Sequence, residues 1–204
     1  MSTAHPAVVD LVEARGPFDP ATAERLRARL IAEAEEQHLL DVAYRIVESP
    51  VGPLLLAATT EGLLRVAFDC EDHDAVLGVL ARRVSPRILW APAPLDEAAR
   101  QLDAYFACSR RSFDLPVDLR LAAGFHRTVL GCLPGIAYGT TQTYSTIAAT
   151  AGSPAAVRAV GSACANNPVP LVVPCHRVVR SDGTIGQYRG GTEAKQALLD
   201  LEAS

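Results

Sequence analysis

A nine-residue segment near the C-terminus, Leu171 to Val179, constrains this chain more than any other. It reads Leu-Val-Val-Pro-Cys-His-Arg-Val-Val, an apolar run that places a cysteine beside a histidine. Such a run predicts a buried strand, and Pro174 predicts its end because proline cannot donate to a sheet ladder. Cys175 is therefore expected at a buried strand edge. The side chain of His176 would point away from it, since successive side chains of a strand face opposite sides.

A cysteine in this position has two interpretations. Free cysteines are among the most buried residues and usually serve as small core side chains. A nucleophilic role needs a group that favours the thiolate, because an ordinary thiol, with a pKa of about 8.5, is mostly protonated at neutral pH. His176 and Arg177 follow directly in the sequence and are the candidates for that group.

The flanking sequence favours the nucleophilic role. The segment from Pro174 to Val178 resembles the Pro-Cys-His-Arg-Val motif of the O6-alkylguanine-DNA alkyltransferases, also called methylated-DNA–protein-cysteine methyltransferases. The resemblance covers roughly residues 125–202. It includes Arg-Ala-Val-Gly at 158–161, Asn-Pro-Val-Pro at 167–170, Gly-Gln-Tyr-Arg-Gly-Gly at 186–191, Lys195, Leu198-Leu199 and Glu202. Several motifs in the family's order are far more specific than any one alone.

The resemblance implies a reaction and the residues that carry it. An alkyl group would pass irreversibly from O6-alkylguanine in duplex DNA to Cys175, in one turnover. The implied arrangement is Cys–water–His–Glu, with His176 as the base and Glu202 as the group that orients it. Arg177 is expected to be structural, and no cofactor is implied. The residues assigned to catalysis or to the substrate are Cys175, His176, Glu202, Tyr144, Asn167, Val178, Tyr188 and Arg189.

A second group of residues would bind DNA. Two short helices are expected at residues 143–149 and 153–165, joined at Gly152 in a helix-turn-helix. Taken alone, the small residues of the second helix would indicate a tightly packed core helix. Beside the cysteine motif they favour a helix that enters the minor groove, where sequence information is sparse. The resemblance implies that Arg158 fills the stack vacated by a flipped base, and the DNA-binding residues are Arg158, Tyr144, Ala155, Ala159 and Gly161.

The chain as a whole predicts an α+β fold in three segments. Residues 1–40 form a helical extension with a helix start at Asp19-Pro20. Residues 41–119 form a small domain with an antiparallel sheet and helices, with strands expected at 44–47, 54–58, 63–68 and 113–117 and helices at 74–84 and 94–108. Residues 120–204 form a mostly helical domain that contains the helix-turn-helix and carries DNA binding and alkyl transfer.

Composition narrows the partners and the compartment. The net charge is −4, but residues 1–120 carry 13 basic and 19 acidic side chains, whereas residues 121–204 carry 6 and 4. The slightly basic second part predicts modest affinity for DNA. Five cysteines without paired spacing, no visible signal peptide and no long apolar run predict a cytoplasmic protein without a membrane partner. Cys70 and His73 lack a second ligand pair, so no metal is expected.

Three alternatives stay open. A thiol hydrolase would need a histidine from a distant segment at the thiol, and His38, His73 and His126 are available. A non-catalytic binder of alkylated DNA would resemble the same domain, but such proteins lack the cysteine. A regulatory helix-turn-helix protein would need polar side chains that read bases, which residues 153–165 do not supply. The favoured hypothesis is a monomer that acts on alkylated double-stranded DNA, and cooperative binding to DNA stays open.

Overall fold

The structure is a computed structural model that describes residues 19, 21, 22, 25, 26, 29, 31, 33 and 40–203. The chain divides into two compact units, residues 1–40 and 41–204. The predicted N-terminal extension lies largely outside the described residues, although those described between Ala21 and Glu33 are helical. The second unit contains a sheet domain followed by a helical part, which is the α+β class expected from the sequence.

The sheet domain has four strands in the order β3-β2-β1-β4. They are β1 (Val42–Val47), β2 (Leu54–Thr59), β3 (Gly62–Phe68) and β4 (Ile88–Trp90). The first three pair antiparallel, as predicted, whereas β4 runs parallel to β1. The sequence does not predict β4, because three residues carry too little periodicity to be recognised.

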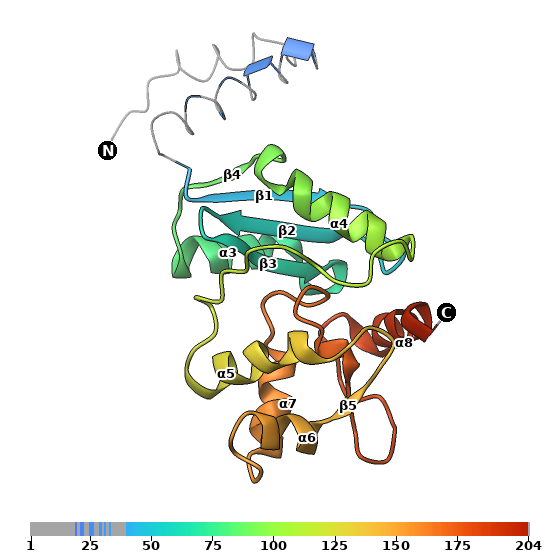
Figure 1. The fold of residues 1–204 in the computed structure, drawn as a ribbon. Coiled ribbons are helices and arrows are strands. Elements are labelled where there is room, and N and C mark those ends of the chain that lie inside the picture. Colours follow the sequence, from blue (N-terminus) through green and yellow to red (C-terminus); the bar gives the residue numbers. More distant parts are fainter. Residues whose placement is uncertain are drawn as a thin grey trace, which may run out of the picture. The chain divides into compact units, whose positions relative to one another are not determined.

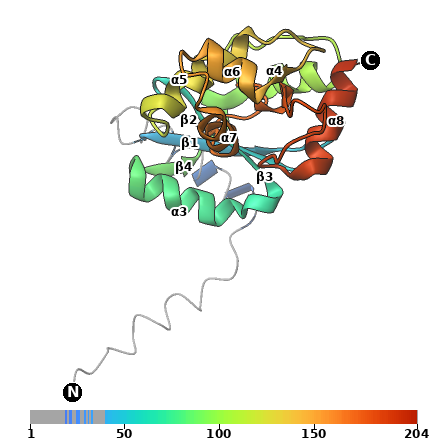
Figure 2. The ribbon, with the colours of Figure 1, turned by 90° about the horizontal axis from the view of Figure 1, so that it is seen from below.

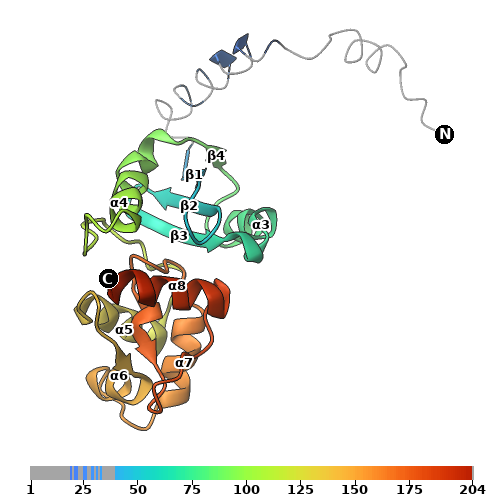
Figure 3. The ribbon, with the colours of Figure 1, turned by 90° about the vertical axis from the view of Figure 1, so that its right-hand side faces the viewer.

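Helices α3 (His73–Arg83) and α4 (Asp96–Phe106) cover opposite faces of this sheet (Figures 1 and 3). The central strand β2 is therefore buried on both sides, which explains its unbroken apolar run at residues 54–58. Val76 and Leu80 of α3 pack in one cluster with Leu55 and Ala57. The sheet domain thus has its own core on either side of β2.

The second part of this unit is mostly helical, as expected. Its helices are α5 (Gly124–Cys132), α6 (Tyr144–Thr150), α7 (Val157–Ala165) and α8 (Gly191–Ala203). A short parallel pair, β5 (Gln142–Thr143) with β6 (Val178–Val179), brings the start of α6 beside the end of the cysteine motif. Helix α7 packs against both α5 and α6 and is seen end-on in Figure 2. The turn between α6 and α7 contains Gly152 at φ +77°.

The prediction of a strand at residues 171–173 is wrong. These residues form turns, and Cys175–Arg177 is a short 3-10 helix that precedes β6. Leu171 has a φ of +74°, outside the extended region, so the backbone turns there. The carbonyl oxygen of Val173 accepts from the side chain of Asn167, and the N–H of Val173 donates to the carbonyl oxygen of Val169, so local partners take the place of a strand. An apolar run shows that a segment is buried, but not which partner satisfies its backbone.

Two smaller boundary predictions also need correction. Of the strand expected at residues 113–117, only Val117 forms a bridge, with Leu63, and the amide of Gln101 bonds both backbone groups of Asp114. Helix α7 begins at Val157 rather than at residue 153. Ala155 therefore lies in the turn before the helix. Pro116 cannot donate to a sheet ladder, and Pro154 lies in the turn before α7, so a proline interrupts the regular element in both places.

Candidate active site

Cys175 sits at the start of the 3-10 helix with a relative exposure of 1%. The buried Asn167 donates from Nδ2 to Cys175 Sγ at 3.1 Å and to the carbonyl oxygen of Val173 at 2.7 Å. Its Oδ1 accepts from the backbone N–H of Val169. One side chain thus holds both the loop and the sulfur that the loop presents. The sequence assigns Asn167 to the site but does not predict its contact with the sulfur.

The electrostatic surroundings keep the resting thiol protonated. Burial raises the pKa of Cys175 to about 11, while the hydrogen bond from Asn167 and the charge of Lys195 oppose this in part. Lys195 is the single lysine of the chain, is fully buried, and donates from Nζ to the carbonyl oxygen of Val178 at 2.6 Å. Burial also lowers the pKa of Lys195. A nearby ammonium favours the thiolate, but a base is still needed to take the proton.

His176 is fully buried, and its Nε2 lies 2.9 Å from Oε1 of Glu202. Burial would raise the pKa of Glu202, but hydrogen bonds from His176 and Arg177 outweigh it and hold the pKa at about 2. An ionised carboxylate only accepts, so Nε2 carries the proton and Nδ1 keeps a lone pair. Nδ1 is buried and has no hydrogen-bond partner among the described residues. Burial lowers the pKa of His176, so the ring is neutral and can take a proton at Nδ1.

Glu202, near the end of α8, is also bonded by three further residues. Tyr105 of α4 donates its hydroxyl to Oε1 at 2.7 Å, and the N–H of Gly139 donates to Oε2 at 3.2 Å. Arg177 donates from Nε and Nη2, each at 2.9 Å, and from Nη1 to the carbonyl oxygen of Ile136 at 2.7 Å. The carboxylate that orients His176 is therefore held rigidly.

Sequence analysis gives no role to Tyr105 or Lys195. Tyr105 is 97 positions from Glu202, and no spacing rule links residues so far apart. Lys195 could have been noticed, because Lys195, Leu198 and Glu202 follow the spacing of one buried helix face. Two charged residues on such a face indicate a partner or a function inside the fold.

Two tyrosines that the sequence assigns to the substrate come from different elements. The hydroxyl of Tyr144, at the start of α6, lies so close to Gly186 that any side chain there would overlap it. Burial raises the pKa of Tyr144 to about 12. The hydroxyl of Tyr188 is buried without a hydrogen-bond partner among the described residues, and burial raises its pKa too. Its ring centroid is 6.4 Å from that of His176. Both hydroxyls stay protonated and can donate to a bound base.

Two further residues assigned to the substrate take part in internal contacts. Val178 is fully buried, and its carbonyl oxygen is the acceptor for Lys195. Arg189 forms an ion pair with Glu71 of the sheet domain and donates to the carbonyl oxygen of Ala165 at 3.3 Å. The sequence places Arg189 beside the substrate and does not predict its partner Glu71.

The residues predicted to bind DNA lie on and before α7. Arg158 and Ala155 are exposed, and Ala159 and Gly161 are half-buried. The opposite side of the helix is buried through Val160, Ala163 and Cys164. The outer side of α7 thus carries one arginine among small residues, as a helix that approaches a narrow groove requires.

The described residues offer little for a metal or a membrane. Within them, no three histidine, cysteine, aspartate or glutamate side chains gather closely enough to hold a metal ion. No described helix combines the length and the hydropathy needed to span a bilayer.

Comparisons with known families cover almost all of the second unit. Residues 42–119 match the family described as "6-O-methylguanine DNA methyltransferase, ribonuclease-like domain". Residues 124–204 match "6-O-methylguanine DNA methyltransferase, DNA binding domain". The sheet domain and the helical part therefore each resemble a domain known from the same class of protein.

Individual relatives give the same result. The chain is 40% identical over 169 residues to the methylated-DNA–protein-cysteine methyltransferase of Mycobacterium bovis, covering 80% of this chain and 93% of the relative. It is 40% identical over 161 residues to that of Methanosarcina barkeri, covering 78% and 96%. Among solved structures, Mycobacterium tuberculosis OGT in complex with DNA is similar, with a TM-score of 0.69, 37% identity, and coverage of 79% and 92%.

Proposed function

Because the chain belongs to the methylated-DNA–protein-cysteine methyltransferase family, we propose that it repairs duplex DNA by moving the alkyl group of O6-alkylguanine onto Cys175. The observation that carries this proposal is the buried sulfur held by Asn167, followed in the chain by a neutral His176 that Glu202 orients. A thiol hydrolase is disfavoured because the histidine of this site directly follows the cysteine in the chain and does not come from a distant segment. The presence of Cys175 disfavours a binder without catalytic activity.

In the first step, the thiol proton of Cys175 passes through a bridging water to Nδ1 of His176. Nε2 cannot receive it, because Nε2 already donates to Glu202. The ionised Glu202 stabilises the imidazolium that forms, and Lys195 stabilises the thiolate. Burial disfavours a pair of thiolate and imidazolium in the resting protein. In the reaction this pair forms beside two fixed charges, with Lys195 favouring the thiolate and Glu202 favouring the imidazolium.

In the second step, the sulfur attacks the alkyl carbon. The S–C bond forms, the C–O6 bond breaks, and its electron pair stays with the guanine. Guanine gains a proton at N1, which balances the proton that left the thiol, and the hydroxyls of Tyr144 and Tyr188 are the nearby donors that assist it. The product, S-alkylcysteine, is a thioether with no ready hydrolytic route. Each molecule therefore reacts once.

The alkylated oxygen must reach a sulfur that is 1% exposed, so the damaged nucleotide has to leave the duplex. The outer side of α7 enters the minor groove, and Arg158 fills the vacated stack. Tyr144 crowds the phosphate beside the flipped nucleotide. This geometry recognises damage by the ease of extrusion and by fit to the pocket, not by sequence.

The central test is intact-protein mass spectrometry after incubation with a duplex that contains one O6-methylguanine. We expect the chain to gain about 14 Da, one CH₂, by stoichiometric capture at the nucleophile. The Cys175→Ser variant should gain nothing and still bind the duplex, and Cys164→Ser, at another buried cysteine, should react like the wild type. A methyl group found on a different cysteine would contradict the assignment.

A second test separates base extrusion from chemistry. Arg158→Ala should slow methyl transfer from duplex DNA by about tenfold or more, because the extruded state loses the group that fills its gap. It should leave the reaction with free O6-benzylguanine base unchanged, since a free base needs no extrusion. Arg100→Ala, at an exposed arginine of α4, is the matched control. Equal slowing with both substrates would argue against this role for Arg158.

A further inference from the structure

The sheet domain supplies a platform under the glycine-rich loop that carries Tyr188. Phe68, the last residue of β3, meets the ring of Tyr188 edge-on at 5.4 Å between centroids. Its ring also lies so close to Gly190 that a side chain there would overlap it. The thiol of Cys70 lies 3.6 Å from the carbonyl oxygen of Arg189. Three consecutive loop residues, 188–190, thus rest on the segment that follows β3.

Glu71 is the charged centre of this platform. Its Oε2 accepts from Arg65 and from Arg189, and its Oε1 accepts from the backbone N–H of Phe68 at 3.0 Å. The side chains of Arg65 and Glu71 are 6% and 10% exposed. The side chain of Arg189 is 31% exposed, so its pair with Glu71 is partly open to solvent. Both arginines donate charge-assisted hydrogen bonds to Oε2, and such bonds are shorter and stronger than those between neutral groups. Glu71 therefore anchors the loop to the sheet domain through Arg189.

Arg65 extends the same cluster to the segment that positions the sulfur. Its Nη1 donates to the carbonyl oxygen of Pro168 at 3.1 Å, and the N–H of Val66 donates to the same oxygen at 2.9 Å. Asn167, the neighbour of Pro168, is the residue that donates to Cys175 Sγ. Glu71 is thus linked both to the loop that carries Tyr188 and to the support of the nucleophile.

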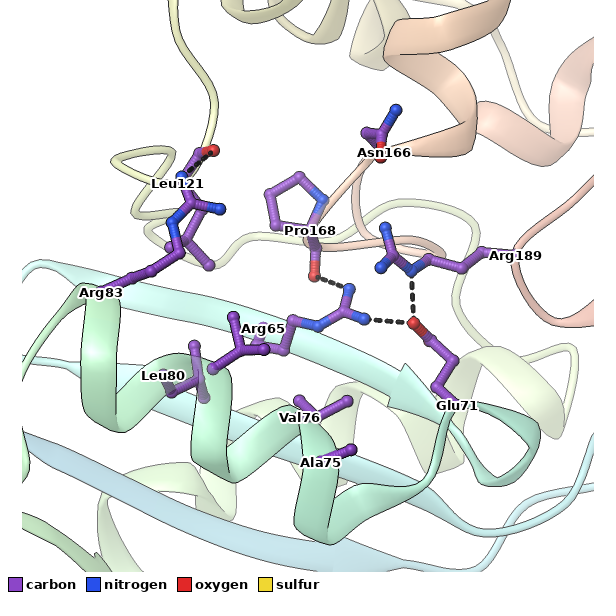
Figure 4. A pocket seen from close by; sticks show the side chains of 11 residues that line it. Arg65, Glu71, Ala75, Val76, Leu80, Arg83, Leu121, Asn166, Pro168 and Arg189 are labelled. Carbon is purple, nitrogen blue, oxygen red and sulfur yellow. Dashed lines mark hydrogen bonds and ion pairs between the residues drawn. The ribbon is translucent and has the colours of Figure 1, made fainter.

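A pocket of about 290 Å³ adjoins this cluster (Figure 4). Arg65, Glu71 and Arg189 line it together with residues of α3, Asn166 and Pro168. Because the Arg189 side chain borders this pocket, this side chain is not fully enclosed by its neighbours. Its position depends on Glu71 and on the carbonyl oxygen of Ala165.

We propose that Glu71 is a positioning residue that, through Arg189, holds the Tyr188 loop against the sheet domain and so limits the size of the O6-alkyl group that the chain accepts. This inference rests on the proposed alkyl transfer. A loop fixed at residues 188–190 gives a narrow pocket that is preorganised for a methyl group. A released loop would place the tyrosine less well for methyl transfer and would give more room to a large substituent.

The test compares single-turnover rate constants for two duplexes, one with O6-methylguanine and one with O6-benzylguanine. For Glu71→Gln we expect the ratio of the methyl rate to the benzyl rate to fall by about fivefold or more, because misplacement of a positioning group penalises the preorganised reaction most. Arg189→Gln should lower the ratio similarly. Because this variant leaves the Arg65–Glu71 pair in place, it tests the proposal even if Glu71→Gln folds poorly. The double variant should resemble the single variants, since both substitutions break one connection.

Asp96→Asn is the matched control, because it neutralises a carboxylate paired with Arg45 on the exposed side of α4. Its ratio should equal that of the wild type. A purely structural role for Glu71 would lower thermal stability and slow both substrates by the same factor, which would overturn the proposal. An unchanged ratio would overturn it as well. A wild-type chain that gains no alkyl mass on Cys175 would instead refute the proposed function itself.

Discussion

The reactivity of Cys175 depends on a balance between burial and a few fixed charges. Burial raises the pKa of its thiol to about 11, and Asn167 and Lys195 act in the opposite direction. A thiol that stays protonated at rest is protected from solvent electrophiles and oxidants. In the proposed reaction, deprotonation must therefore coincide with substrate binding, when His176 takes the proton. Residues that stabilise the thiolate therefore control the rate.

Substitution of Lys195 by methionine tests this balance. Loss of the positive charge raises the pKa of Cys175 further, so the thiolate fraction at any pH below that pKa falls. The rate constant of transfer increases with pH, and in this variant the increase should occur at higher pH. Transfer at pH 7.5 should slow by about tenfold for each pH unit by which the increase is displaced. Single-turnover rates between about pH 6.5 and 9.5 measure it. Lys195→Arg, which keeps the charge, should have the pH dependence of the wild type. An unchanged pH dependence in Lys195→Met would exclude an electrostatic role for Lys195.

Among the helices, α7 has to pack inside the fold and, in the proposed function, to contact DNA. These two requirements can be tested separately. The inner side of α7 packs through Val160, Ala163 and Cys164. In the proposed function its outer side comes close to DNA. Gly161 lies within the helix, half-buried, with no heavy atom within 4 Å of where a Cβ would stand. Nothing in the fold requires a glycine there. Packing therefore does not explain the missing side chain, whereas the proposed contact with DNA would require it.

Gly161→Ala should consequently raise stability and lower function. The free energy of unfolding should increase by about 0.5–1 kcal/mol, because alanine favours a helix more than glycine does and meets no clash. Affinity for duplex DNA should fall, since an added methyl group keeps the helix from the groove floor. Urea unfolding and fluorescence anisotropy measure the two effects. Gly131→Ala, at another uncrowded glycine on α5, should stabilise the fold without changing affinity.

These elements also show what a single sequence can predict. Long periodic segments such as α4 and strands such as β2 are predicted well, because their apolar spacing reflects a continuous buried face. The motif around Cys175 predicts the nucleophile and its histidine, and both side chains are buried in the structure. The loop at residues 171–173 is mispredicted because Val173 bonds to the side chain of Asn167 and to the backbone of Val169 in place of a strand partner. The ion pair between Glu71 and Arg189 joins residues 118 positions apart, and no local pattern encodes it.

In the whole molecule, the part that matches a DNA-binding domain offers few positive charges to DNA. Residues 121–204 contain six basic side chains. Arg177 and Lys195 are buried, and Arg189 is paired with Glu71. The exposed ones are Arg127, Arg158 and Arg180. Because the preceding part of the chain is acidic, the molecule as a whole repels the DNA backbone, and binding relies on a small set of contacts.

The dependence of DNA affinity on salt should therefore be shallow. If three exposed arginines neutralise three phosphates, the logarithm of the association constant should fall with the logarithm of salt concentration at a slope of about −2.7. Affinity would then drop by roughly 40-fold between about 50 and 200 mM salt. Anisotropy titrations of the full chain on an unmodified duplex measure this slope. Arg180→Ala should reduce its magnitude by about one, whereas Arg100→Ala on α4 should not alter it. A slope steeper than about −6 would mean that DNA contacts a much larger charged surface than α7 and its neighbours provide.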